Sequence, residues 1–403
     1  MTREEVYSEC LTKLEKSDFL LLELATGMGK SKQAIDIINC LVETKYQGKH
    51  TSMLLLVAKT VHKQTWKDEF KKWGGINVDE LTIECYESLK KHEYESFDFV
   101  VMDECHHLHS DKRLDLFSTL TYGHVIGLSA TIPKKLKQYF QYEYAAEVVT
   151  CSIVDAIEDE VLPEPQIILY PLQLDNVRPT ESIELNPKAK GKTYYGNYNE
   201  LWKYRKMKVH AIISCTPRQR VNEYNSQILY EKNRYMRTRQ DFLKNKWLFD
   251  CGERIKYLAN LKNHIVLSIL QRLEKERTIT FCKTIEQADI LGKYSIHSKN
   301  KDSDIIYNNF NAKKINHIVS VNVLNEGANL VDCKYAVFAN YSSSEICSAQ
   351  RVGRSLRHKS PVIILPYYEA TREEEIVNTM IESFKEESIH IIHSLKELDK
   401  FIQ

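Results

Sequence analysis

A short glycine-bearing segment, LATGMGKSK at residues 24–32, contains residue types that bind phosphate groups. It follows the apolar run at residues 18–23, which has the length of a strand, and precedes residues 31–45, whose apolar positions recur at helical spacing. A helix that begins at Lys30 would direct its unpaired backbone N–H groups and its positive end toward one point. An anionic phosphate fits such a point, so the spacing predicts a phosphate-binding loop.

The individual residues of this loop suit a nucleoside triphosphate. Gly27 and Gly29 lack a Cβ and let the backbone come close to a ligand. Lys30 would reach the β- and γ-phosphates, and the Ser31 hydroxyl would ligate Mg²⁺. The usual pattern, G-x-x-x-x-G-K-[ST], has glycine where this chain has Leu24, so the match is incomplete. Taken alone, the segment leaves open a surface turn with a solvated lysine.

Two adjacent carboxylates end another apolar run, within FDFVVMDECHHLHS at residues 97–110. The run predicts a strand whose carboxyl end carries Asp103 and Glu104, and ligands of open α/β sheets bind outside that end. One carboxylate can hold Mg²⁺ through water, and its neighbour can orient and deprotonate an attacking water molecule. Loop and carboxylates together predict hydrolysis of a nucleoside triphosphate.

The same segment contains potential metal ligands in CHHLH, namely Cys105, His106, His107 and His109. A structural zinc site needs a further ligand cluster at a suitable spacing, and the sequence contains none. The metal-site interpretation is therefore the weaker alternative.

Length and composition indicate a globular protein with more than one domain. The chain has 403 residues, 43% of them hydrophobic and 28% charged, with a formal net charge of +1. Its ten cysteines include no C-x-x-C pair, so we expect neither a disulfide framework nor a zinc site. No apolar run approaches the roughly 18 residues of a membrane helix. These features favour the reducing cytoplasm of a bacterium or of a virus-infected host cell, and no membrane contact.

The order of apolar runs predicts an α/β fold. Short apolar runs alternate with helical patterns up to about residue 174, and the same alternation returns from about residue 277. We therefore expect two parallel-sheet domains in tandem, at residues 1–174 and 271–403. Residues 175–270 carry few strand signals, and we expect a mainly helical segment there.

This middle segment concentrates positive charge. Residues 188–246 contain fifteen Lys and Arg against four acids, a local charge of +11, so the remainder of the chain must be near −10. Seven tyrosines lie among these charges, including Tyr194, Tyr195, Tyr198 and Tyr204. Cations that meet phosphates and rings that stack on bases are typical of nucleic-acid binding. We expect Arg234, Arg237 and Arg239 to contact nucleic acid; the alternative is a solvated helical insert with tyrosines packed inward.

The order of motifs resembles that of superfamily 2 helicases. ATGMGKS resembles their nucleotide loop, as seen in restriction-enzyme motor subunits, and DECHH resembles their DExH motif. SAT at residues 129–131, TITFCKTIEQADIL, VLNEGANLVD and QRVGRSLR follow in the family's order. The likeness is greater to DNA motors of the phage recombination and restriction types than to DEAD-box RNA helicases, because the D-E-A-D tetrad is absent. It implies two RecA-like domains with ATP and Mg²⁺ between them.

The resemblance also implies a role for each matching residue. It implies catalytic roles for Lys30, Asp103, Glu104, Gln350, Arg354 and Arg357. It implies nucleotide contacts by Thr26, Gly27, Met28, Gly29, Lys30, Ser31, Gly327 and Asn329, with Mg²⁺ held by Ser31 and Asp103. It implies coupling of hydrolysis to domain movement through Ser129, Ala130 and Thr131, and nucleic-acid contacts by Lys59 and Thr60 in VAKTVHKQTW, where a buried helix start is the alternative.

Two departures and several alternatives accompany this assignment. No glutamine precedes Gln33, so the adenine-reading glutamine of many relatives has no counterpart, and Asn329 replaces a more usual aspartate. The favoured function is an ATP-dependent helicase or translocase acting on single-stranded, duplex or branched DNA. The alternatives are a DExH RNA helicase, or a non-catalytic nucleic-acid-binding or motor subunit. No nuclease constellation stands out, so cutting would need a nuclease partner, and a replication or recombination partner also stays open.

Overall fold

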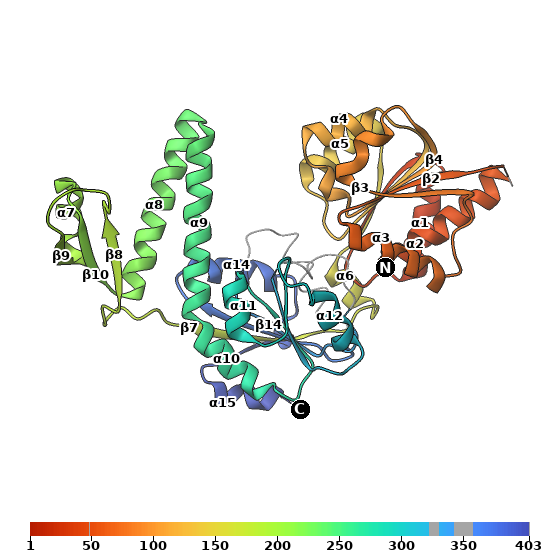
Figure 1. Ribbon diagram of the computed structural model, residues 1–403. Coiled ribbons are helices and arrows are strands. Elements are labelled where there is room, and N and C mark those ends of the chain that lie inside the picture. The colour runs from red at the N-terminus through yellow and green to blue at the C-terminus, as the bar shows by residue number, and fades with distance from the viewer. Residues whose placement is uncertain (48, 322–329, 342–357, 403) are drawn as a thin grey trace.

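The first domain is built on a parallel sheet of six strands in the order β3-β2-β4-β5-β1-β6. The computed structural model describes residues 1–47, 49–321, 330–341 and 358–402 (Figure 1). The strands of this sheet are β1 (Phe19–Leu24), β2 (Ser52–Val57), β3 (Glu80–Cys85), β4 (Ser96–Asp103), β5 (Thr121–Ser129) and β6 (Glu147–Cys151).

Helices cover both faces of this sheet. One face packs against α1 (Arg3–Leu14), α2 (Lys30–Leu41) and α3 (Thr60–Lys72). The other face packs against α4 (Asp111–Ser118), α5 (Lys134–Tyr144) and the 3-10 helices Tyr86–His92 and Cys105–Leu108. The π-helix Val42–Tyr46 extends α2, and α6 (Ile153–Glu158) follows the last strand. Strands buried on both faces need apolar residues at successive positions, which explains the uninterrupted runs of the sequence.

The second domain contains a parallel sheet of seven strands in the order β12-β13-β11-β14-β15-β7-β16. Its strands are β7 (Gln166–Leu172), β11 (Thr278–Phe281), β12 (Ser295–Ile296), β13 (His317–Ser320), β14 (Tyr335–Phe338), β15 (Val362–Tyr368) and β16 (Ile389–Ile391). One face packs against α10 (Asn263–Arg272), α11 (Ile285–Leu291) and α15 (Leu395–Leu398). The other packs against α12 (Ser303–Asn311) and α14 (Arg372–Ile381). Short 3-10 helices at Glu386–Ser388 and Asp399–Phe401 complete it. The prediction of two parallel-sheet α/β domains is confirmed.

Strand β7 corrects the predicted domain assignment. We placed the run at residues 166–170 in the first domain, but β7 pairs in parallel with β15 and with β16 in the second sheet. Helix α10 also lies earlier than the predicted start at residue 271, because its Val266, Ile269 and Leu270 belong to the core of the second sheet. The chain therefore contributes one strand to the second sheet before the middle segment and the remaining strands after it.

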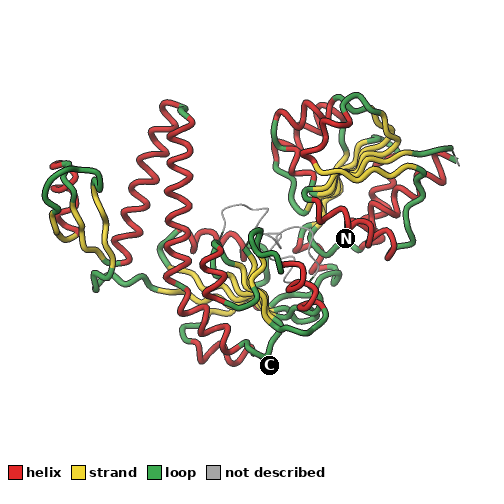
Figure 2. The backbone as a smooth tube through the Cα atoms, in the orientation of Figure 1, coloured by secondary structure: helices red, strands yellow, loops and turns green. Residues whose placement is uncertain are grey.

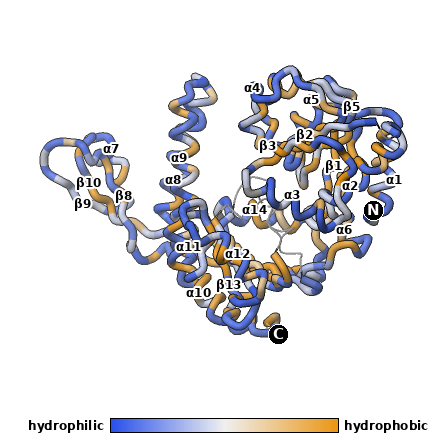
Figure 3. The backbone as a smooth tube through the Cα atoms, turned by 45° about the vertical axis from the view of Figure 1, so that its right-hand side comes forward, coloured by the Kyte–Doolittle hydropathy of each residue, from blue (hydrophilic) through white to orange (hydrophobic). Residues whose placement is uncertain are grey.

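The middle segment projects from the second domain as a helical hairpin and a small sheet (Figure 2). The hairpin consists of α8 (Pro217–Thr238) and α9 (Asp241–Leu261). The small sheet has the order β8-β10-β9 and contains β8 (Glu181–Leu185), β9 (Tyr194–Asn197) and β10 (Ala211–Cys215), with the 3-10 helix Tyr198–Glu200 and α7 (Leu201–Met207). We predicted its helices but not its strands. In Figure 3 the hydrophobic segments gather inside the two large domains.

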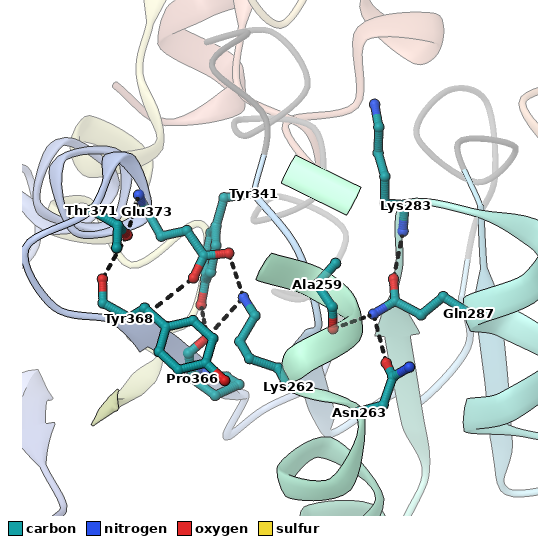
Figure 4. Close-up of polar contacts among 10 residues, drawn as sticks. All are labelled: Ala259, Lys262, Asn263, Lys283, Gln287, Tyr341, Pro366, Tyr368, Thr371 and Glu373. Carbon is teal, nitrogen blue, oxygen red and sulfur yellow. Dashed lines mark hydrogen bonds and ion pairs between the residues drawn. The ribbon is translucent and has the colours of Figure 1, made fainter. Parts of the chain in front are cut away.

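A buried lysine joins the hairpin to the second domain. Lys262, the residue between α9 and α10, is fully buried, and its Nζ lies 2.6 Å from Glu373 Oε1 (Figure 4). The same Nζ donates to the carbonyl of Pro366 at 3.4 Å and lies 4.7 Å from the ring centroid of Tyr341. Glu373 Oε2 accepts a hydrogen bond from the backbone N–H of Tyr368 at 3.1 Å. Burial lowers the pKa of Lys262, and the carboxylate of Glu373 opposes that shift.

A second polar cluster fixes the adjacent turn. The Gln287 side chain donates to the carbonyl of Ala259 at 3.1 Å and to Asn263 Oδ1 at 3.0 Å, and accepts from the backbone N–H of Lys283 at 3.0 Å (Figure 4). Gln287 is fully buried on α11. The end of α9 and the start of α10 are thus bound to two separate elements of the second domain.

Lys262→Met should destabilise the second domain by about 3–5 kcal/mol, because it leaves the buried carboxylate of Glu373 without its cation. Urea unfolding of the full chain, followed for the transition of this domain, measures the loss. Lys313→Met is the matched control, since Lys313 pairs with Asp332 at 2.6 Å on the surface and should change stability by at most about 1 kcal/mol. The double variant Lys262→Met/Glu373→Leu should recover part of the loss. Equal losses of stability in Lys262→Met and Lys313→Met would contradict the role of Lys262 as the cation that compensates the buried Glu373.

Candidate functional site

The glycine loop connects β1 to α2 in the predicted way. Gly27 has φ 108° and Gly29, the residue before α2, has φ 84°, and both lie in the left-handed region that glycine adopts without strain. No side chain caps the start of α2, and the first-turn N–H groups of a helix point toward its N-terminal end, where an anionic ligand can bind. The Lys30 Nζ donates to the carbonyl of Leu24 at 3.1 Å, so the lysine folds back over the loop.

Sheet order brings the carboxylates to this loop. β1 pairs with β5, and β5 pairs with β4, all in parallel. In the register, Glu23 lies beside Ser129, and Leu128 lies beside Asp103. The carboxyl ends of the three strands therefore meet at one edge of the sheet, where the glycine loop leaves β1.

Hydrogen bonds hold Asp103, and an unusual backbone conformation positions Glu104. Asp103 Oδ2 accepts a hydrogen bond from Trp66 Nε1 at 2.9 Å, and the Asp103 carbonyl accepts one from the Tyr86 hydroxyl at 2.8 Å. Glu104 is buried, and its backbone is left-handed with φ 52°. A non-glycine residue in this conformation indicates a tightly constrained backbone at the strand end.

Ser129 links Glu104 to the SAT segment. Its buried hydroxyl lies 3.5 Å from Glu104 Oε2 and 3.0 Å from His106 Nδ1. The same hydroxyl accepts from the backbone N–H of Thr131 at 3.2 Å and lies 2.8 Å from the Thr131 carbonyl. His106 Nδ1 is also 3.4 Å from Glu104 Oε2. A change at Glu104 can therefore reach residues 129–131 directly, with Ala130 half-buried between them.

A cavity of about 840 Å³ lies between the glycine loop and the two carboxylates. Its lining includes Thr26, Gly27, Met28, Gly29, Lys30, Ser31, Asp103 and Glu104. This volume falls within the range of cavities that bind nucleotide-sized ligands. The structure thus places the predicted phosphate-binding and carboxylate residues of the first domain around one space.

Helix α1 contributes lining residues that we did not predict. Arg3, Glu4, Tyr7 and Ser8 line the cavity, and Arg3 Nη2 donates to the Gly27 carbonyl at 3.2 Å. Gln33 Nε2 donates to the Arg3 carbonyl at 2.8 Å, which ties α1 to α2. Burial, followed by the neighbouring Cys40, raises the pKa of the Tyr7 hydroxyl to about 12. The capping box of Thr2 and Glu5 is a sequence signal for the start of this helix. The packing of the helix against the glycine loop has no such local signal.

The potential metal ligands of CHHLH serve other purposes. Burial, together with the carboxylates of Glu104 and Asp103, raises the pKa of the Cys105 thiol, which disfavours the thiolate that a metal needs. His106 contacts Ser129, and the ring of His107 stacks on Tyr86. Within residues 1–47, 49–321, 330–341 and 358–402, no group of three or more His, Cys, Asp or Glu side chains has the arrangement of a metal site.

Several predicted residues lie outside this cavity or outside the described residues. Lys59 and Thr60 lie exposed at the start of α3, so the alternative of a buried helix start is wrong. Gln350, Arg354, Arg357, Gly327 and Asn329 lie outside the described residues.

The basic middle segment separates into surface and core residues. Arg234, Arg237 and Arg239 are exposed at the far end of the hairpin. Arg234 Nη1 lies 3.3 Å from the buried Glu231, and the Arg239 guanidinium lies 5.6 Å from the ring centroid of Tyr235. Tyr204 packs in the core of the small sheet, so for this residue the alternative of a tyrosine packed inward holds.

No helix of the described part of the chain combines the length and apolar composition needed to cross a bilayer.

The nine cysteines that the structure describes are free thiols.

Two families match separate parts of the chain. Residues 2–134 match the family described as Type III restriction enzyme, res subunit, and residues 261–359 match the Helicase conserved C-terminal domain. The first match contains the loop and carboxylates, and the second begins near Lys262.

Two curated relatives match parts of the chain. The EcoAI endonuclease subunit of an Escherichia coli type I restriction enzyme is 28% identical over 191 residues, 40% of this chain and 23% of that protein. QP509L of African swine fever virus, which carries the name of an ATP-dependent RNA helicase, is 29% identical over 131 residues, 27% of this chain and 24% of that protein. The chain spans less than a quarter of the length of either relative.

Two solved structures share the fold over nearly the whole chain. A variant of S. cerevisiae Dbp5 bound to RNA and ADP BeF3 has a TM-score of 0.60 and 12% identity, with 99% of this chain and 92% of that chain covered. The type ISP restriction-modification enzyme LlaBIII bound to DNA has a TM-score of 0.56 and 14% identity, with 100% of this chain and 32% of that chain covered. At these identities the likeness establishes the fold.

Gly27→Ala should destabilise the first domain by about 1–3 kcal/mol, because it combines a left-handed backbone with a steric conflict. A Cβ at Gly27 would lie 2.8 Å from Leu162 Cδ2. Gly75→Ala is the matched control, since Gly75 has φ 86° and nothing within 4 Å of a Cβ. Thermal unfolding of both variants measures the difference. A Gly27→Ala loss no larger than that of Gly75→Ala would show that Leu162 does not restrict the loop.

Proposed function

Since the chain belongs to the superfamily 2 helicases, we propose that it is an ATP-dependent DNA helicase or translocase. The observation that carries this proposal is the single cavity lined by the glycine loop and by the carboxylates of Asp103 and Glu104. ATP is the proposed substrate, and its hydrolysis would drive movement along DNA or remodelling of DNA.

The loop would bind the phosphates of ATP. Gly27 and Gly29 leave room for phosphate oxygens, the start of α2 directs its positive end toward them, and Lys30 supplies a positive charge. Mg²⁺ fits the donor set, because Ser31 and Asp103 offer a hydroxyl and a carboxylate oxygen to the same cavity. When bound, Mg²⁺ would neutralise charge that develops on the phosphates.

Glu104 is the proposed general base. Its buried carboxylate would orient the attacking water and accept its proton at Oε2, which Ser129 and His106 hold in place. Proton transfer leaves Glu104 neutral and weakens its contacts with these two residues. That change supports a coupling role for Ser129, Ala130 and Thr131, because Thr131 shares the Ser129 hydroxyl.

The second domain would complete the site. Gln350, Arg354 and Arg357 would position the water and stabilise the transition state from that domain, and Gly327 and Asn329 would contact the nucleotide. These assignments stay predictions from the sequence, as do nucleic-acid contacts by Lys59 and Thr60.

Two relatives favour DNA as the track, and two others keep RNA as the alternative. The EcoAI subunit is part of a restriction enzyme and LlaBIII was solved with DNA. Dbp5 was solved with RNA, and QP509L bears the name of an RNA helicase. The ATPase rate with single-stranded DNA, duplex DNA, branched DNA and RNA separates these possibilities. Stimulation by RNA alone would overturn the choice of DNA.

A nuclease partner is a further proposal, and co-purification from cells tests it.

Glu104→Gln should bind ATP with Mg²⁺ yet hydrolyse it about 10²–10⁴-fold more slowly, because the amide keeps the shape of the side chain but cannot accept a proton. Nucleotide binding by equilibrium dialysis and turnover of bound ATP measure the two effects separately. Lys30→Ala should remove hydrolysis by weakening the phosphate contacts themselves. Normal turnover of bound ATP by Glu104→Gln would reassign Glu104 to a structural role.

Neutralising Arg234, Arg237 and Arg239 with glutamine should weaken duplex DNA binding equally for unrelated sequences, since phosphate contacts carry no base information. If all three contact phosphates, the slope of log affinity against log salt falls by roughly 0.9 per contact, or about 2.7 in total. Fluorescence anisotropy across a salt series measures this slope. Lys112→Gln/Lys134→Gln/Lys135→Gln is the matched control, because it removes the same charge from exposed positions of the first domain. Equal slopes for both triple variants would exclude the arginines as the DNA contact.

A further inference from the structure

The small sheet of the middle segment has one face buried in its own core. Ile183 and Leu185 of β8 and Ala211 and Ile213 of β10 are buried on that face. Leu201 and Tyr204, from the helical segment after β9, cover them. The small sheet therefore has a hydrophobic core separate from those of the two large domains.

The opposite face of the small sheet is open to solvent. Tyr195 of β9 is 74% exposed and lies beside Ile212 in the register, with Glu184 on the other side of Ile212. The next row places Ser214 between Ser182 and Asn197, and all three side chains are exposed. An exposed tyrosine thus shares this face with short hydroxyl and amide side chains.

Positive charge is concentrated in the segment that forms the small sheet, partly on α7, which covers the buried face, and partly in the connection before β9. Residues 176–216 contain eight Lys and Arg against three Glu, a local net charge of +5. Lys188, Lys190 and Lys192 are exposed in the connection that leads into β9. Tyr195 is the second residue of β9, three positions after Lys192, so the connection brings positive charge to the start of the strand that carries the ring.

We propose that the open face of the small sheet binds single-stranded nucleic acid, with a base stacked on Tyr195 and the backbone along Lys188, Lys190 and Lys192. A flat aromatic ring stacks on any base, and nearby lysines follow the phosphates. Ser182, Asn197 and Ser214 offer hydrogen-bonding groups to the edge of a base. A duplex hides its base faces, so this surface selects a single strand. The proposal rests on the proposed function only in taking nucleic acid as the partner.

One acidic side chain, Glu184, would disfavour phosphates on the β8 side of this face. Glu184 Oε1 lies 3.0 Å from His210 Nε2, and His210 Nδ1 lies 2.9 Å from Thr193 Oγ1. The carboxylate would repel phosphates over β8, whereas Lys192, two residues before β9, would attract them there. Backbone phosphates would therefore lie on the β9 side, with the base directed toward Ile212.

Binding of a short fluorescein-labelled oligothymidylate to the full chain without nucleotide tests the proposal by fluorescence anisotropy. Tyr195→Ala should weaken binding by about 5- to 150-fold, the range expected for loss of one stacked base. Its salt slope should stay unchanged, since no charge is removed. Tyr195→Phe should keep the wild-type affinity because it keeps the ring. Lys190→Gln/Lys192→Gln should instead reduce the salt slope by about 0.7 per lost contact.

Tyr142→Ala is the matched control, because Tyr142 on α5 is 88% exposed and lies in the first domain. Equal affinities of wild type and Tyr195→Ala would overturn the proposal. So would equal losses in Tyr195→Ala and Tyr142→Ala, or displacement of the oligothymidylate by polyglutamate at the same charge concentration, which would indicate an acidic protein partner. A thermal unfolding midpoint equal to wild type verifies the fold of each variant.

The proposed function and this inference fail separately. Stimulated ATPase activity without any Tyr195 effect would overturn only the binding face. Tyr195-dependent binding without nucleic-acid-stimulated ATPase activity would support the binding face and overturn the motor assignment.

Discussion

The parallel direction of β1, β5 and β4 is the constraint on which the candidate site depends. Because these adjacent strands run the same way, their carboxyl ends meet at one edge, and the loop before Lys30 faces Asp103 and Glu104. An antiparallel pairing of the same strands would put loop and carboxylates at opposite edges of the sheet. The 3-10 helix after Glu104 then places His106 against Ser129, which adds the SAT segment to the same edge.

A second constraint fixes the middle segment relative to the second sheet. The chain enters that sheet as β7, leaves it for the small sheet and the hairpin, and returns through α10. Both ends of the excursion are anchored in one domain: β7 pairs with β15 and β16, and Lys262 contacts Glu373. An ion pair of this kind contributes little net stability but strongly penalises arrangements that leave one charge buried alone. It therefore fixes the orientation of the base of the hairpin.

Local sequence patterns were sufficient for the loop, the carboxylates and the class of fold. Each depends on residues close in the chain, such as Lys30 after two glycines or Asp103 at the end of an apolar run. The sequence did not show which sheet β7 joins, because QIILY is an apolar run that fits a buried strand of either parallel sheet. The strands of the small sheet were also missed, since they are short and lie among polar residues. The contact between Arg3 and Gly27 depends on how α1 packs, and its sequence signal ends at the capping box.

The tyrosines of the middle segment show why composition alone does not assign a surface. Successive residues of a strand point to opposite faces, so Tyr195 is exposed while the preceding Tyr194 turns toward the core. Tyr204 is buried because α7 packs its inner face on the same sheet. The charge count treats all these residues alike, although only some of them face solvent. The backbone thus selects which aromatic rings remain near the lysines. Since the rest of the chain is near −10, the proposed anionic strand would be attracted to this projecting segment rather than to the remainder of the surface.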